Sequence, residues 1–447
     1  MVQPPGPPTR KTLMVQERQG RFPAEIWDRS LQELDSSSLG SVRLVNTFFR
    51  DVATRLFFRW IVLRFRPGWR VVRFMSEMLK QSRYRFHVRE LELCILTELD
   101  LTHRVGCMLR GGLKAMPNLT KLTLTLSRPD RWDTHSHMVP KFLSSVHLRR
   151  LEELSYQGDL CCGIEEFASR HASTLKKLEL DADAPPGYIS TSAGPPFAQL
   201  YEATAPSASI GFLAQSGMPL LKKFELLYFD DMQTTLNALV VLASNKSDLE
   251  ELRLSVVGLG EAIFVVVAQH FPRLRSLIIS CNTEFGAFHA IDQWSDVLAA
   301  SGVLRNCAKL TELVSLDWSN GYYGRWDRGW ELLLKISHGN PNLDYITLPD
   351  SGMWQRVHKA FWVPSYLDPN EPKRLGYRWL VDSILRQSYS CLPSLLAVIK
   401  AKLDECGNNL ESEVHEPGSV IESLKQGPLL SSAVYDLLQL GRDLKLY

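Results

Sequence analysis

The sequence contains little that points to a membrane protein or to a disulfide-stabilised one. No stretch approaches the ~20 apolar residues that a membrane-spanning helix needs. The first residues contain no apolar core of signal-peptide length. The 8 cysteines include no CxxC pair, so we expect reduced, buried thiols. These absences predict an intracellular protein, cytoplasmic or nuclear, that binds no membrane.

A strong net charge is also lacking over the whole chain, although not over its first part. The 447 residues carry a formal net charge of +2. Residues 1–90 nevertheless contain 17 Lys and Arg against 8 Asp and Glu, a local balance of +9. Because these basic residues are scattered among Trp, Phe and Leu, the pattern favours a protein-docking module over a solvated basic tail. We expect no nucleic-acid partner.

Signatures of catalysis and of metal binding are missing as well. The chain has no Gly-x-Ser-x-Gly elbow and no Cys–His pair in a recognisable setting. Asp133, His135 and His137 could contribute to a metal site, but no further ligand at metal-site spacing lies nearby in the sequence. The stretch from Gly258 lacks the third glycine and the later acidic residue of a dinucleotide fingerprint. We interpret the first as a repeat loop and the second as a turn into a helix. The sequence therefore predicts a protein that is not an enzyme and uses no metal or cofactor.

What the sequence does contain is an internal repeat. The repeated phrase has apolar residues at its first, fourth and sixth positions and polar residues between them. It begins at Val88, Leu119, Leu151, Leu175, Leu221, Leu249 and Leu274, with weaker copies at Leu310 and Leu343. The alternation at its end is typical of a short strand with one buried face. Helix-compatible stretches lie between many of the phrases, so the unit is a strand followed by a helix at ~20–35 residue spacing, as in a leucine-rich repeat.

This repeat predicts an α/β fold with an irregular solenoid of parallel strands on a concave face and helices outside. We expect disorder in residues 1–20, a three-helix module in 21–65, the repeat array in 66–352 and a helical C-terminal cap in 353–447. The interval 181–219 is predicted to be a loop or a degenerate repeat with its strand near 197–203. The stretch Trp60–Phe65 is expected to be a strand.

The front module is a compact run of helical signals. Pro23 suits the first turn of a helix, and Ser37 or Ser38 can cap a second helix, whose apolar side would be formed by residues 39–48. A third segment covers 52–58. Three short helices bury little by themselves, so such a module is expected to be completed by a partner or by the domain behind it.

The stretch "FPAEIWDRSLQEL…LGSVRLVNTFFRDVATRLFFRWIVL" resembles an F-box, over about a tenth of the chain. An F-box followed by leucine-rich repeats resembles the substrate receptors of cullin-type ubiquitin ligases. The resemblance implies that the module binds an acidic Skp-type adaptor, and through it a cullin complex, while the repeats bind an unidentified protein target. The adaptor-binding residues that it implies are Pro23, Ile26, Leu34, Leu39, Leu44 and Val45.

The target surface is expected on strand residues that point away from the core and in a segment rich in Trp, Tyr and Arg, which are frequent in binding hot spots. The predicted residues are Lys177, Glu179, Lys223, Glu225, Glu251, Arg253, Trp318, Tyr322, Tyr323 and Trp326. The aromatic residues have an alternative role, which is to fold onto the array and close its core. Two alternatives remain for the whole chain: a repeat scaffold whose F-box-like helices only cap the solenoid, and an enzyme with a site hidden in the aromatic segment.

Overall fold

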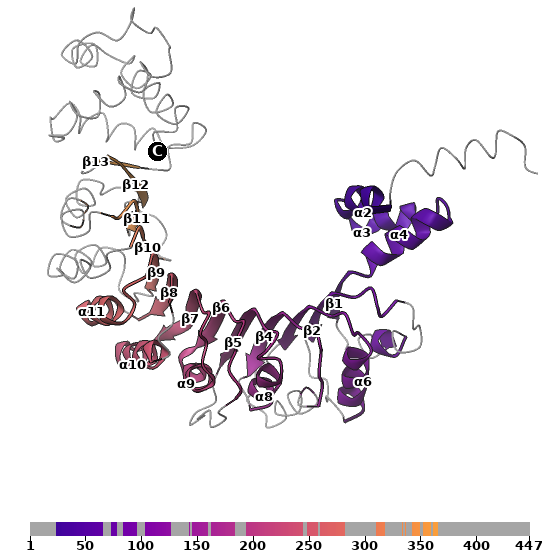
Figure 1. The fold of residues 1–447 in the computed structure, drawn as a ribbon, viewed down its shortest axis with the longest axis horizontal. Helices are drawn as coiled ribbons and strands as arrows, with labels where there is room; N and C mark the ends of the chain where they lie inside the picture. Colours follow the sequence, from indigo (N-terminus) through magenta and orange to yellow (C-terminus); the bar gives the residue numbers. More distant parts are fainter. Residues whose placement is uncertain are drawn as a thin grey trace, which may run out of the picture. The chain divides into compact units, whose positions relative to one another are not determined.

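A computed structural model describes most of the chain between residues 24 and 364 (Figure 1). The described residues are 24–65, 73–77, 84–95, 103–126, 143, 145–159, 162–183, 194–244, 248–257, 260–281, 310–317, 333, 336, 342–348, 352–358 and 361–364. The chain divides into two compact units, residues 1–200 and 201–447. The predictions for residues 1–20 and 365–447 lie outside the described residues.

The first unit begins with a helical module of residues 24–57. Its helices are α2 (Ala24–Gln32), α3 (Ser36–Val42) and α4 (Thr47–Phe57). The cap of α3 differs from the prediction, because Asp35 caps the helix in place of Ser37 or Ser38. The Asp35 carboxylate accepts hydrogen bonds from the backbone N–H of Ser38 at 2.7 Å and from the Ser37 hydroxyl at 2.9 Å. Hydrogen bonds from Ser38 and, with a smaller contribution, from Ser37 hold the pKa of Asp35 below its ordinary value.

The second helix is also shorter than predicted. It ends at Val42, and Leu44 and Val45 lie in the turn before α4. The Asn46 side chain accepts a hydrogen bond from the backbone N–H of Phe49 at 2.9 Å and thereby caps α4. Because an Asn N-cap takes an extended backbone conformation, one continuous helix through residues 39–48 is not formed.

Five parallel strands follow in the first unit. They are β1 (Trp60–Phe65), β2 (Glu90–Ile95), β3 (Lys121–Leu126), β4 (Glu153–Asp159) and β5 (Lys177–Asp183). The described helices between them are α6 (His103–Lys114) and α8 (Cys162–Arg170), which lie on the same side of these strands (Figure 1). The predicted strand at residues 60–65 is confirmed, and it pairs with β2 as a member of the sheet.

The second unit continues the alternation of strand and helix. Its elements are β6 (Glu202–Pro206), α9 (Ser207–Ser216), β7 (Lys223–Asp230), α10 (Met232–Ala243), β8 (Glu251–Val256), α11 (Glu261–His270), β9 (Ser276–Cys281), β10 (Glu312–Asp317), β11 (Tyr345–Leu348), β12 (Gly352–His358) and β13 (Phe361–Pro364). Neighbouring strands from β6 to β11 pair in parallel. The predicted repeat architecture, parallel strands with helices between them, is therefore confirmed at this level.

The core of the array consists of the apolar positions of the repeated phrase. In the repeat around β8, for example, Leu249, Leu252 and Leu254 are each 1% exposed or less. The backbone also repeats, because the carbonyl before a strand accepts hydrogen bonds from two N–H groups of the next repeat. The Glu250 carbonyl accepts from Arg275 at 2.8 Å and from Ser276 at 3.0 Å. This double acceptance keeps successive strands in the same register.

The interval 181–219 contains a complete repeat. Its strand β6 begins at Glu202, several residues after the predicted start. The buried residues Leu200, Ala203 and Ala205 have the spacing of the repeated phrase, with alanine in place of the larger apolar residues. Ala203 pairs with Phe224 of β7 and Ala205 with Leu226, so large side chains of the next strand lie beside the alanines.

The helical cap predicted from residue 353 is wrong for the first described residues of that region. Residues 352–358 and 361–364 form β12 and β13, and β12 pairs antiparallel with β11. The Trp354 side chain is fully buried opposite Ile346. The tryptophan, valine and phenylalanine of this stretch suit a strand against an open sheet edge.

One buried histidine joins the end of α8 to the segment that leads into β4. His171 is 1% exposed. Its Nε2 accepts a hydrogen bond from the backbone N–H of Leu148 at 2.8 Å, and its Nδ1 lies 2.7 Å from the Phe167 carbonyl. Nδ1 must therefore carry the proton in the neutral ring. Burial, with smaller contributions from His147 and Arg170, lowers the pKa of His171 to about 4.

Candidate interaction surfaces

The helical module has a small core. Leu31, Leu39, Val52 and Ala53 are buried together, and the partly buried hydrophobic residues that pack against them are Val42, Phe49, Leu56 and Phe57. Trp27 contacts Phe49 edge-on, with ring centroids 4.9 Å apart. Few apolar side chains are thus fully removed from water by the module itself.

Several large apolar side chains of the same module are exposed. Leu44 is 82% exposed, Val45 66%, Ile26 47%, Phe48 43% and Leu34 36%. Leu44 and Val45 have high exposure because they lie in the turn between α3 and α4 and not on a helix face. Exposed apolar surface of this kind marks a site that another polypeptide can cover.

The six residues implied as adaptor contacts do not share one environment. Ile26, Leu34, Leu44 and Val45 are exposed, whereas Leu39 is only 6% exposed and belongs to the module core. Its position on α3 directs it toward Val52 and Ala53, so Leu39 supports the module from inside and offers no free surface. Pro23 lies outside the described residues. Phe48 is also exposed, at 43%, but was not among the six residues that the resemblance implies.

The module also contacts the start of the array. The ring of Phe58, which follows α4, stacks on Tyr84 with centroids 4.5 Å apart. The Arg43 guanidinium lies 5.2 Å from the ring centroid of Phe57 and 5.9 Å from that of Phe58. The chain then enters β1 directly. The last turn of α4 is therefore tied to the first repeats, while the turn at Leu44 and Val45 is exposed.

The outward strand residues form rows of alternating charge. The first outward residue of each strand contributes to what we call the face row. In the first unit this row is Trp60, Glu90, Lys121, Glu153 and Lys177, and in the second it is Glu202, Lys223, Glu251, Ser276, Glu312 and Tyr345. Lys121 Nζ lies 3.2 Å from the Glu153 carboxylate, and Lys223 Nζ lies 3.0 Å from that of Glu251. Register thus places opposite charges side by side.

Three of the predicted target-binding residues are joined in one such cluster. The Glu251 carboxylate contacts Lys223 at 3.0 Å and the Arg253 guanidinium at 2.7 Å. Burial opposes ionisation of Glu251, but the hydrogen bonds from Lys223 and Arg253 outweigh it and lower the pKa of this carboxyl. Lys177, Glu179 and Glu225 lie at half-buried outward positions of β5 and β7. The strand face is therefore polar and largely neutralised by its own pairs.

A second row lies just before the strands, and we call it the entry row. It consists of the residue whose carbonyl accepts the two N–H groups of the next repeat. In the first unit these residues are Arg59, Arg89, Thr120 and Glu152, followed by Lys176, and in the second they are Tyr201, Lys222, Glu250, Arg275 and Thr311, followed by Asp344.

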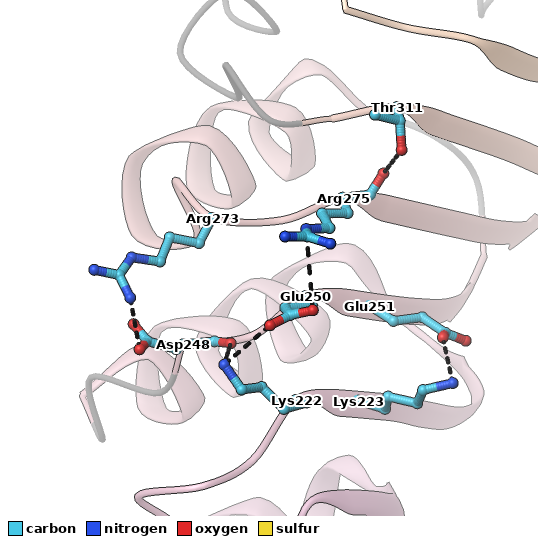
Figure 2. Close-up of polar contacts among 8 residues, drawn as sticks. All are labelled: Lys222, Lys223, Asp248, Glu250, Glu251, Arg273, Arg275 and Thr311. Atoms are coloured by element: carbon cyan, nitrogen blue, oxygen red, sulfur yellow. Dashed lines mark hydrogen bonds and ion pairs between the residues drawn. The ribbon is translucent and has the colours of Figure 1, made fainter.

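Figure 2 shows the entry row of the second unit, where charged neighbours are paired. The Glu250 carboxylate lies 3.0 Å from Lys222 Nζ and 4.0 Å from Arg275 Nε. Beside them, Arg273 and Asp248 are 2.6 Å apart. In the first unit, Lys176 and Glu152 are paired in the same way at 2.8 Å. Charged side chains at this edge therefore stabilise one another across repeats.

Two sequence predictions lie partly or wholly outside the described residues. The aromatic candidates Trp318, Tyr322, Tyr323 and Trp326 are outside them, as are Asp133, His135 and His137. In the described part of the chain, no group of three or more His, Cys, Asp or Glu side chains could hold a metal ion. The helix expected after the stretch from Gly258 is confirmed, because α11 begins at Glu261, whereas residues 258 and 259 lie outside the described residues. Among the described helices, none has the length and apolar character needed to span a membrane.

Comparison with known proteins gives no family. No family model matches the chain, and no curated protein matches it. Among solved structures, the chain is similar to a protein of Bacteroides fragilis known from a crystal structure, with 14% sequence identity and a TM-score of 0.29. The match covers 61% of this chain and 62% of the length of that protein.

Proposed function

We propose that the chain is a non-catalytic substrate receptor of a cullin-type ubiquitin ligase. In this proposal the helical module of residues 24–57 binds an acidic Skp-type adaptor, and the outward face of the strands binds a protein target. The receptor would act by proximity, because holding a target beside a ubiquitin-conjugating enzyme raises its effective concentration. Other subunits would perform the chemistry.

The observation that carries the proposal is the exposed apolar surface of the module. Leu44 and Val45 are 82% and 66% exposed, whereas the described core of the module has four buried residues. A module with so small a core gains stability when a partner covers such side chains. The basic balance of residues 1–90 agrees with an acidic partner.

The test is capture of a purified Skp-type adaptor by the Leu44→Ser/Val45→Ser variant. Burial of an aliphatic side chain of this size contributes about 1.5 to 2 kcal/mol. Loss of both contacts should therefore weaken adaptor binding by about 200- to 800-fold. Because both side chains are exposed in the chain alone, the thermal unfolding temperature should hardly change.

The matched control is Val240→Ser/Val241→Ser. These neighbouring valines of α10 are also exposed, at 46% and 39%, and lie outside the module. The control variant should bind the adaptor as the wild type does. Failure of the wild-type chain to capture the adaptor, or equal losses in the two variants, would refute the proposal.

A second function is favoured by the contacts between the module and the first repeats. The stacking of Phe58 on Tyr84 and the direct entry of α4 into β1 are what a solenoid cap requires. In that case the chain would be an interaction scaffold without adaptor. Deletion of residues 1–58 separates the two functions. If the module is only a cap, the deletion destabilises the array and there is no adaptor binding to lose.

A further inference from the structure

The entry row contains one pair of neighbours that departs from the pairing seen elsewhere. Elsewhere in the described entry row, charged neighbours have opposite signs and form ion pairs, as in Glu152 with Lys176 and Glu250 with Lys222 and Arg275. Arg59 and Arg89 are adjacent and both positive. The Arg59 carbonyl accepts hydrogen bonds from the N–H groups of Arg89 at 2.9 Å and of Glu90 at 3.0 Å. We call Arg59 and Arg89 the arginine pair.

The arginine pair has no compensating partner in the described chain. Both residues are exposed. Among the described residues, neither guanidinium forms an ion pair or a side-chain hydrogen bond, while the nearby Arg64 and Arg73 are paired with Glu92 and Glu77. Like charges at directly opposed positions of neighbouring strands destabilise a sheet. An anionic partner would remove this repulsion.

Other charges around the pair leave a positive surplus. Glu90 is the nearest carboxylate in sequence and register. Arg85 lies against the ring of Phe86, with its guanidinium 5.1 Å from the ring centroid. Arg55 is 3.8 Å from Asp28, a long and exposed ion pair that contributes little. Of these charged residues, most are positive, which favours a partner with negative charge.

An apolar anchor lies beside the pair. Trp60 follows Arg59 directly, opens the face row and is 62% exposed. Val62, two residues further along the same outward face, is 36% exposed. Trp and Arg are the residue types that dominate binding hot spots, because they combine a large apolar area with polar groups. The combination fits a ligand that presents carboxylates and one apolar side chain together.

We infer that Arg59, Arg89 and Trp60 form a docking site for an acidic segment of a protein, in which carboxylates contact the two guanidinium groups and an apolar side chain covers Trp60. The inference relies on the proposed function only in naming the owner of this segment as the target protein. The site is on the first two strands, apart from the exposed turn at Leu44 and Val45 that the adaptor would cover.

The probe is a fluorescent peptide in which glutamates flank a central phenylalanine, added to the full chain without adaptor and followed by fluorescence anisotropy. Peptides with lysine or glutamine in place of glutamate are the comparison. The glutamate peptide should bind best. The Arg59→Ala/Arg89→Ala variant should lose at least about tenfold in affinity, because charge-assisted hydrogen bonds to both guanidinium groups are removed.

The matched control is Arg149→Ala/Arg150→Ala. These two arginines are also adjacent and exposed, and no described residue pairs with them. The control removes the same charge from the whole chain and should bind the peptide as the wild type does. Equal losses in the two double variants would show mere net attraction and overturn the inference, as would preference for the lysine or glutamine peptide.

A single substitution tests both the repulsion between Arg59 and Arg89 and their binding of the glutamate peptide. Arg89→Glu creates an opposite-charge neighbour for Arg59, like the pair of Glu152 and Lys176. It should raise the thermal unfolding temperature and abolish binding of the glutamate peptide. A lower unfolding temperature or retained peptide binding would contradict the inference.

The adaptor proposal can fail independently. The Leu44→Ser/Val45→Ser variant should still bind the glutamate peptide, and Arg59→Ala/Arg89→Ala should still capture the adaptor. Loss of adaptor capture in the arginine variant would assign the pair to the adaptor interface and overturn the inference.

Discussion

The helical module and the repeat array use their apolar residues differently. In the array, the first, fourth and sixth residues of the phrase are almost completely buried, as in Leu221, Phe224 and Leu226 of the repeat around β7. In the module, Leu44 and Val45 remain largely exposed. Each repeat is completed by its neighbours in the chain, whereas the module contains more apolar surface than its own core uses. The difference agrees with the proposed division of roles, in which the array supplies stability and the module binds a partner.

The largest expected effect contrasts a leucine of each region. Leu226→Ala removes a fully buried side chain from β7 and should lower the free energy of unfolding by about 3 kcal/mol, through lost burial and the cavity that remains. Leu44→Ala should change it by less than about 0.5 kcal/mol, since its side chain is already in water. Urea denaturation followed by circular dichroism measures both. Similar losses in the two variants would remove the distinction between the regions.

The next effect is the pH dependence that buried His171 gives to the array. Its folded pKa of about 4 lies below the ordinary value of 6.5, so the folded state resists protonation. Above pH 6.5 the residue is neutral in both states and contributes no pH dependence. As the pH falls from 6.5 to 4, only the unfolded state binds the proton, and about 3 kcal/mol of stability should be lost.

The His171→Gln variant isolates this contribution, because glutamine keeps a donor and an acceptor but does not titrate. As the pH falls from 6.5 to 4, the free energy of unfolding of the wild type should decrease by about 3 kcal/mol relative to that of the variant. Parallel pH profiles would show that His171 does not titrate in this range.

The smallest effect concerns the cap of α4 in the module. Asn46→Ala removes the hydrogen bond to the Phe49 N–H and should cost about 1 kcal/mol, while Asn46→Asp should retain most of the cap. Because the module core is small, the loss should appear as faster amide hydrogen exchange in α3 and α4 with unchanged exchange in β7 to β9. Uniformly faster exchange over both regions would mean that the module and the array unfold as one.

The repeat phrases predicted their strands because they encode burial directly. The phrase from Leu249 became β8 with its apolar positions in the core. The repeat at Leu200 was predicted only as a loop or a degenerate repeat with its strand several residues too early, because Ala203 and Ala205 are too small to stand out as core residues, although they are buried. The hairpin of β12 and β13 was missed for another reason. Its strands are stabilised by the open edge of β11, which no local pattern announces.

The interaction residues were less predictable than the strands. Alternation correctly placed Lys223, Glu251 and Arg253 on the outward side of their strands, but it did not show that Glu251 holds both cations. Leu39 and Leu44 are both apolar and close in sequence, yet one is in the module core and the other is exposed. The helix boundaries decide this, since α3 ends at Val42 and α4 begins after its cap Asn46, which leaves Leu44 in the turn between them.

The sequence by itself determined the repeat, the direction in which each phrase faces and the surplus of basic residues in its first ninety positions, because these depend on spacing and composition alone. Only the tertiary structure decided which charges meet. Parallel register places Glu250 between Lys222 and Arg275 but sets Arg59 beside Arg89. Residues some thirty positions apart become neighbours only when the strands are aligned, and hydrogen bonds of the backbone, not the side chains themselves, set that alignment.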